Sequence, residues 1–179
     1  AMKYAALPRK ELGVRTLFNM LGPLANPAGA RGQLLGVFAP ELTEPFAQVL
    51  RELGSKRAWV VHGMDGLDEI TVTTTTRVTE LRDGRITTRE FDPLPYIGEM
   101  HAVAGLAGGA PEMNAKILRD VLACRLHGAC RDIVLLNAAA GIVTGGKVDE
   151  FRDAFGLARE SLDSGRAMEK LDALVRETR

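Results

Sequence analysis

Two apolar runs that flank a helix-like segment constrain the fold of this chain more than any other feature. Residues 33–38 read QLLGVF and residues 58–61 read AWVV, and continuous apolar runs of this length are typical of buried strands. Between them apolar residues recur at helical spacing, at Leu42, Phe46, Val49, Leu50 and Leu53. Gly54 is expected to end that helix. Short connections between strand, helix and strand indicate a βαβ unit in a largely parallel sheet that is buried on both faces.

The middle of the chain predicts an antiparallel hairpin. Residues 70–76 (ITVTTTT) and 77–81 are β-branched and alternating, and residues 86–91 return to this pattern. Asp83-Gly84 stands between the runs, and such a pair favours the tight turn of a hairpin. We therefore expect an α/β domain with a mostly parallel central sheet, flanked by helices, and an inserted antiparallel hairpin.

Four helices are expected after the hairpin. The first begins at Pro111 and runs to about His127, because proline suits the first turn of a helix. The second covers residues 133–143, which are apolar on nearly all sides. The last two cover residues 150–163 and 165–177, and Ser164 between them is an N-cap candidate.

Composition excludes several classes of protein. Lys and Arg number 23, as do Asp and Glu, so the formal net charge is zero, and no broad attraction to nucleic acid or to an anionic membrane is expected. No apolar run reaches the roughly 18 residues that a membrane span needs. The two cysteines, Cys124 and Cys130, are too few for a disulfide framework and lack the spacing of a metal site. We expect a cytoplasmic domain without nucleic-acid or membrane partners.

Three carboxylates lie close together directly after the second predicted strand. Asp65, Asp68 and Glu69 fall within the segment GMDGLDE, at the carboxyl end of a strand, where open α/β sheets bind ligands. No lysine or arginine separates them, so a divalent cation would relieve their repulsion. Mg²⁺ is the natural choice, because one or two carboxylates usually hold it together with water and substrate phosphates. An ordinary acidic surface turn is the alternative interpretation.

Other candidate residues indicate less about chemistry. Arg9 stands in an irregular segment and could hold a carboxylate in a bidentate contact, or it could be a solvated charge paired with Glu11. Asn19 could reach a site, although capping of a backbone group is the commoner use of such a residue. His62 ends a predicted strand and could serve as an acid or base, or have a structural role. No catalytic residue is identified.

Two stretches resemble the anthranilate phosphoribosyltransferases. Residues 15–27 read RTLFNMLGPLANP, similar to that family's R-T-x-F-N-x-L-G-P-L-x-N-P. Residues 61–69 read VHGMDGLDE, similar to its V-H-G-x-D-G-L-D-E. The similarity continues through the hairpin, residues 106–109 and residues 136–140 to the C-terminus. The resemblance implies the large domain of the nucleoside phosphorylase and phosphoribosyltransferase-like fold.

The family's activity is implied by the same resemblance. It is the transfer of a phosphoribosyl group from phosphoribosyl diphosphate (PRPP) to the amine of anthranilate, with release of diphosphate, in tryptophan biosynthesis. The resemblance implies Mg²⁺ bound by Asp68 and Glu69, contact of Arg9 with anthranilate, and a homodimer. A second hypothesis is a non-catalytic relative that binds nucleic acid or a ligand. A third is a nucleoside phosphorylase of the same fold.

Two departures from the family pattern affect these expectations. Pro8 stands directly before Arg9, whereas the family has a valine between proline and arginine, so the backbone of Arg9 could be re-aimed. The family's glycine-rich diphosphate loop, G-T-G-G-D, and its K-H-G-N segment have no counterpart in these 179 residues. We therefore expect residues 1–179 to be the C-terminal portion of the α/β catalytic domain, without the N-terminal helical domain and the diphosphate-binding loop, and to be inactive alone.

Overall fold

The computed structural model describes Glu11, Gly22, Leu24, Ala25 and residues 29–178. The chain divides into two compact units, Ala1–Ala30 and Arg31–Arg179. In the first unit, the Ala25 amide donates a hydrogen bond to the Gly22 carbonyl at 3.4 Å. The helix predicted over residues 15–21 lies outside the described residues, as do Arg9 and Asn19.

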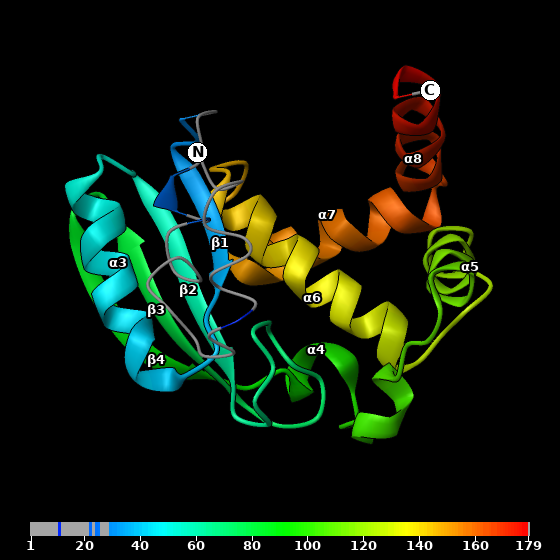
Figure 1. The fold of residues 1–179 in the computed structure, drawn as a ribbon, viewed down its shortest axis with the longest axis horizontal. Coiled ribbons are helices and arrows are strands. Elements are labelled where there is room, and N and C mark those ends of the chain that lie inside the picture. The colour runs from blue at the N-terminus through cyan, green and yellow to red at the C-terminus, as the bar shows by residue number, and fades with distance from the viewer. Residues whose placement is uncertain (1–10, 12–21, 23, 26–28, 179) are drawn as a thin grey trace. The chain divides into compact units, whose positions relative to one another are not determined.

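The predicted strand–helix–strand unit opens the second unit (Figure 1). Strand β1 (Gly32–Gly36) and strand β2 (Arg57–Gly63) pair in parallel. A 3-10 helix, η2 (Pro40–Leu42), and helix α3 (Thr43–Glu52) connect them. The prediction of a βαβ unit is therefore confirmed.

Helix α3 ends where the glycine predicted it would. The Gly54 amide donates to the Arg51 carbonyl, and the Ser55 amide donates to the Leu50 carbonyl, each at 3.0 Å. Gly54 has φ of +87°, and these two bonds form a Schellman motif, which satisfies the last carbonyls of the helix. The chain is thereby turned back into β2.

The sheet continues from β2 into the predicted hairpin. Strand β3 (Thr76–Arg82) pairs antiparallel with β2, strand β4 (Arg85–Phe91) pairs antiparallel with β3, and the order is β1-β2-β3-β4. Asp83 and Gly84 form the turn, with φ of +48° and +85°. The α/β class and the hairpin are confirmed. Of the three strand pairs within the described residues, β1–β2 is parallel and the other two are antiparallel, because the hairpin extends the same sheet.

Residues 70–75 differ from the prediction, because they form an irregular segment and not a strand. Their backbone groups bond partly to side chains and partly to single backbone groups, such as the Val72 carbonyl, which accepts a hydrogen bond from the His101 amide at 2.9 Å. The Thr71 amide donates to Thr76 Oγ1 at 3.1 Å, and the Ile70 amide donates to Asn137 Oδ1 at 3.0 Å. The β-branched composition alone does not decide the structure here, since tertiary contacts override β-propensity.

Helices cover both faces of the sheet (Figure 1). Helix α3 lies against β2, β3 and β4, whereas helix α6 (Ala129–Thr144) lies against β1 and β2. Trp59 and Val61 of β2 belong to the apolar core that α6 and helix α7 (Phe151–Asp163) complete. Val60 is also fully buried and points to the opposite face, because successive side chains of a strand alternate.

Further helical elements follow the hairpin. They are α4 (Leu94–Ile97), η3 (Val103–Leu106), α5 (Pro111–Leu122) and α8 (Arg166–Glu177). Helix α6 confirms the expected helix over residues 133–143, and α7 and α8 confirm the last two. Within the described residues, none of the helices has both the length and the apolar character that a membrane crossing requires.

Two predicted helix ends are wrong. Helix α5 stops at Leu122, before the expected end near His127. The chain turns at Cys124, whose φ is +56° and whose amide donates to the Val121 carbonyl at 3.0 Å. Ser164 does not cap α8: it is the C-cap of α7, and Gly165 precedes α8 without a side-chain cap.

Candidate active site

The carboxylates predicted from the sequence lie on a loop that follows β2. This carboxylate loop comprises residues 64–75, between β2 and β3. The Gly63 amide donates to the Leu67 carbonyl and the Gly66 amide donates to the Gly63 carbonyl, both at 2.8 Å. These bonds close a tight turn at the carboxyl end of the parallel β1–β2 pair, the location at which open α/β sheets bind ligands.

Asp65 organises the carboxylate loop from within. Its Oδ2 accepts hydrogen bonds from the hydroxyls of Thr71 and Thr73, each at 2.5 Å, and its Oδ1 accepts one from the Leu67 amide at 3.2 Å. Partial burial by itself would raise the pKa of Asp65, but these hydrogen bonds outweigh it and hold the pKa below its usual value. The Asp65 carboxylate therefore stabilises the conformation of the carboxylate loop.

Of the three carboxylates that the sequence places close together, only two therefore remain as candidate metal ligands. In the part of the chain that the structure describes, no group of three or more His, Cys, Asp or Glu side chains is arranged to hold a metal ion. Asp68 and Glu69 remain, because Asp65 is directed to the threonine hydroxyls.

We expect Asp65→Asn to lower stability by about 1 kcal/mol near neutral pH, since hydrogen bonds to a charged acceptor are replaced by weaker ones at an exposed site. The folded pKa of Asp65 is depressed. Its stabilising effect is therefore present above the unfolded pKa, about 3.9, and is lost as the pH falls through the folded pKa. Urea unfolding from about pH 7 to about pH 3 should show the two proteins converging.

The matched control is Thr88→Val, which removes the hydroxyl that lies 2.9 Å from Thr79 Oγ1 in the hairpin. Its stability difference from the wild type should not change with pH, because no ionisable group is involved. A constant difference for Asp65→Asn across the same range would contradict the role assigned to its carboxylate.

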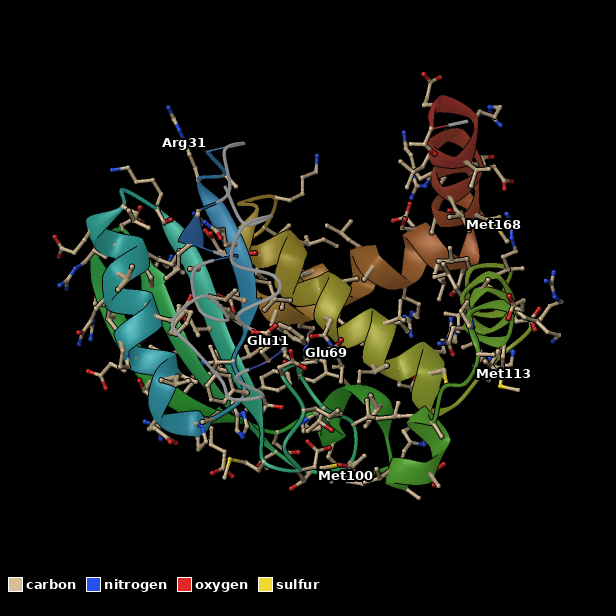
Figure 2. All side chains as sticks on the ribbon, viewed as in Figure 1. Glu11, Arg31, Glu69, Met100, Met113 and Met168 are labelled. Atoms are coloured by element: carbon tan, nitrogen blue, oxygen red, sulfur yellow. The ribbon has the colours of Figure 1, made fainter. Side chains whose placement is uncertain are left out.

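Asp68 and Glu69 stand side by side on the exposed part of the carboxylate loop. Among the described residues, neither takes part in a salt bridge. Partial burial and, secondly, the negative charge of Asp68 raise the pKa of Glu69 above its usual value. Figure 2 shows Glu69 beside α6, and it lines a cavity of about 370 Å³ with Ile133 and Val134 of that helix.

This donor set fits a magnesium ion. Because neither carboxylate forms a salt bridge among the described residues, the two repel each other, and a divalent cation would remove that repulsion. Mg²⁺ suits the pair, because it usually keeps several waters and takes only one or two protein carboxylates, with substrate phosphates completing its coordination. A site built by more protein ligands would suit Ca²⁺ or Zn²⁺ better.

Two contacts that the sequence analysis missed hold the pair in place. Gly36 of β1 approaches Asp68 so closely that a Cβ at position 36 would lie 1.6 Å from the Asp68 carbonyl oxygen. Asn137 of α6 bonds to both backbone groups of Ile70. An isolated glycine inside a strand pattern signals such a close approach, so Gly36 could have been found. Asn137 offered no comparable signal.

Two of the three histidines have structural partners. His62 is buried, and its Nδ1 lies 2.7 Å from the Val37 carbonyl oxygen, which favours the structural interpretation of this residue. The Nε2 atom of His101 lies 2.7 Å from Asp132 Oδ2, a partner that no sequence pattern indicated. The free thiols are half-buried and belong to Cys124 and Cys130.

Comparison with known proteins assigns the family. The sequence matches the family described as "Glycosyl transferase family, a/b domain" over residues 1–168. The chain belongs to this family. The a/b domain is 56% identical over 178 residues to the anthranilate phosphoribosyltransferase of Syntrophobacter fumaroxidans, and the match covers 99% of this chain and 52% of that protein. For the enzyme of Desulfosudis oleivorans the identity is 51% over 179 residues, with 100% and 53% covered.

Solved structures carry the same names. The a/b domain is similar to the crystal structure of anthranilate phosphoribosyltransferase from Thermus thermophilus, with 41% identity and a TM-score of 0.89, covering 98% of this chain and 51% of that one. The enzyme from Saccharomyces cerevisiae in complex with PRPP and Mg has 30% identity and a TM-score of 0.85, with 96% and 49% covered. The resemblance and the fold class inferred from the sequence are confirmed. The chain spans about half the length of the curated relatives it matches.

Proposed function

We propose that the protein containing this chain transfers the phosphoribosyl group of PRPP to the amine of anthranilate, giving phosphoribosylanthranilate and diphosphate in tryptophan biosynthesis. The observation that carries this proposal is the Asp68–Glu69 pair at the carboxyl end of β2, in a domain whose relatives are anthranilate phosphoribosyltransferases. An acidic pair of this kind would hold a magnesium ion, which would supply positive charge beside a substrate that carries phosphate groups.

Asp68 and Glu69 would hold Mg²⁺, and the PRPP complex of the Saccharomyces cerevisiae enzyme contains Mg as well. When bound, the ion would neutralise negative charge on diphosphate and so make diphosphate a better leaving group. The chain contributes by presenting both carboxylates, which the bonds around Asp65 and Ile70 keep in place. We assign no general base to this chain, because positioning of the two reactants and charge neutralisation supply the rate enhancement.

We propose that Arg9 binds the carboxylate of anthranilate. A guanidinium can contact both oxygens of a carboxylate at once, which a lysine does less well. In the product of the complete gene, Arg9→Ala should raise the KM for anthranilate about tenfold or more and the KM for PRPP much less. Lys10→Ala, at the next position, is the matched control and should change neither. An equal rise in both constants for Arg9→Ala would contradict the assignment.

A homodimer and a cytoplasmic location complete the proposal. The free thiols Cys124 and Cys130 agree with a reducing compartment. We also propose that residues 1–179 alone are inactive, since the family's diphosphate loop is not among them.

The test of the proposed function is loss of anthranilate fluorescence that depends on PRPP and Mg²⁺. It is made with the product of the complete gene. Phosphorolysis of thymidine or uridine in place of this reaction would indicate a nucleoside phosphorylase. Absence of both reactions, together with salt-dependent binding of DNA, would indicate a binding module.

A further inference from the structure

Asn137 uses its whole side chain to bind backbone atoms. Its Oδ1 accepts a hydrogen bond from the Ile70 amide at 3.0 Å, and its Nδ2 donates to the Ile70 carbonyl at 2.9 Å and to the Ile133 carbonyl of its own helix at 2.9 Å. Both amide hydrogens have acceptors and the oxygen has a donor. The opposite orientation would place the NH₂ group against the Ile70 N–H, so the hydrogen bonds define which way the carboxamide points.

Ile70 is the residue at which the carboxylate loop enters the core. Its side chain is fully buried and belongs to the same apolar core as Leu136 and Ala140 of α6. Its backbone lies outside the strands, so neither group has a partner in a strand ladder. Because a buried backbone group without a hydrogen bond costs about 1–3 kcal/mol, the carboxamide of Asn137 stabilises the chain at this point.

The position of Asn137 within α6 makes this use specific. Residues 133–143 read IVLLNAAAGIV, and Asn137 is the one polar side chain among them. A helix that is apolar on all sides gains nothing from a polar residue in its middle, unless that residue has a defined partner. The partner is the backbone immediately after Glu69, 67 positions away in the sequence.

We propose that Asn137 is a positioning residue for the Asp68–Glu69 pair. It fixes the backbone at Ile70, and consecutive Cα atoms are only 3.8 Å apart, so a shift at Ile70 moves Glu69 with it. Asp65 holds the loop from within, and Gly36 allows β1 to approach Asp68. Asn137 provides the contact between α6 and the carboxylate loop. The identity of the ion and substrate rests on the proposed function, whereas the hydrogen bonds to Ile70 do not.

The test measures metal binding directly, in the product of the complete gene. Mn²⁺ serves as the probe, and its binding in the presence of inorganic diphosphate is followed by electron paramagnetic resonance. Asn137→Ala should weaken Mn²⁺ binding about tenfold or more, as is usual when a residue that orients a metal ligand is removed. The amide of Ile70 should also exchange its hydrogen faster than in the wild type.

Thr144→Val is the matched control in the same helix. The Thr144 hydroxyl donates to the Ala140 carbonyl at 2.9 Å and is not bonded to the carboxylate loop among the described residues. This variant loses a buried hydrogen bond of α6 but should keep the Mn²⁺ affinity of the wild type. If Asn137→Ala does not fold, Asn137→Gln replaces it, because the added methylene keeps the amide and displaces it from Ile70. Wild-type Mn²⁺ affinity in a folded Asn137 variant would overturn the proposal.

The two proposals fail in different ways. If the wild type binds Mn²⁺ with diphosphate, and Asn137→Ala weakens that binding, the positioning role stands even if no phosphoribosyl transfer is found. If the wild type catalyses the transfer and Asn137→Ala binds Mn²⁺ unchanged, the positioning role alone is wrong.

Discussion

Gly36→Ala should lower the kcat/KM of the complete protein about a hundredfold or more. The new Cβ would lie 1.6 Å from the Asp68 carbonyl oxygen, far inside any contact distance, and neither backbone segment can rotate away as a side chain could. The loop must therefore move by more than an ångström, and a misplacement of that size can cost a hundredfold in rate. Steady-state assays with Mg²⁺ varied at saturating PRPP measure the effect.

Gly32→Ala separates this effect from simple destabilisation. Gly32 lies on the same strand, and a Cβ there would be 2.1 Å from the Thr144 carbonyl oxygen, at the other end of β1. It should cost stability to a similar degree, about 1–3 kcal/mol, yet the folded fraction should keep its activity. Gly141→Ala, with nothing within 4 Å of the added Cβ, should be neutral or slightly stabilising. Wild-type activity in Gly36→Ala would refute the close approach between β1 and the loop.

Asp68→Ala should lower kcat/KM about a hundredfold and raise the Mg²⁺ concentration needed for half-maximal rate. One of the two carboxylates that would hold the ion is lost, and the remaining Glu69 changes as well. The charge of Asp68 is one of the causes that raise the pKa of Glu69, so its removal should lower that pKa. Mg²⁺ titration of the initial rate is the measurement.

Asp83→Asn is the control for the loss of one negative charge. Asp83 lies in the hairpin turn with φ of +48°, a conformation that asparagine also adopts readily. Its Mg²⁺ titration should coincide with that of the wild type. If the titration of Asp68→Ala coincides too, the metal assignment is wrong.

Local patterns in the sequence were sufficient to predict the strand–helix–strand unit and the hairpin of the sheet. The unit from β1 to β2 and the hairpin at Asp83-Gly84 follow from hydrophobic periodicity and turn chemistry, which act over a few residues. The placement of Asp68 and Glu69 follows from the rule that ligands bind at the carboxyl ends of strands. Both residues lie after β2 on the carboxylate loop and are exposed, whereas their binding of a metal stays a prediction.

The roles of Asp65 and Asn137 and the structure of residues 70–75 depend on contacts between distant segments, which the sequence does not indicate. Asp65 looked equivalent to its two neighbours until the fold placed Thr71 and Thr73 around it. Asn137 looked like one more residue of an apolar helix, because its partner Ile70 is 67 positions away. Residues 70–75 have a strand-like composition, but the backbone amides of Ile70 and Thr71 bond to side chains, and a pattern of β-branched residues does not report such partners.

The most direct test of the proposed function compares two quantities in one reaction. The product of the complete gene is mixed with anthranilate, PRPP and Mg²⁺, and the loss of anthranilate fluorescence is measured together with the diphosphate released. The account predicts that both depend on all three components and that one diphosphate forms for each anthranilate consumed. Residues 1–179 alone should give neither signal. Unchanged fluorescence, with a product confirmed to contain the upstream glycine loop, would contradict the account.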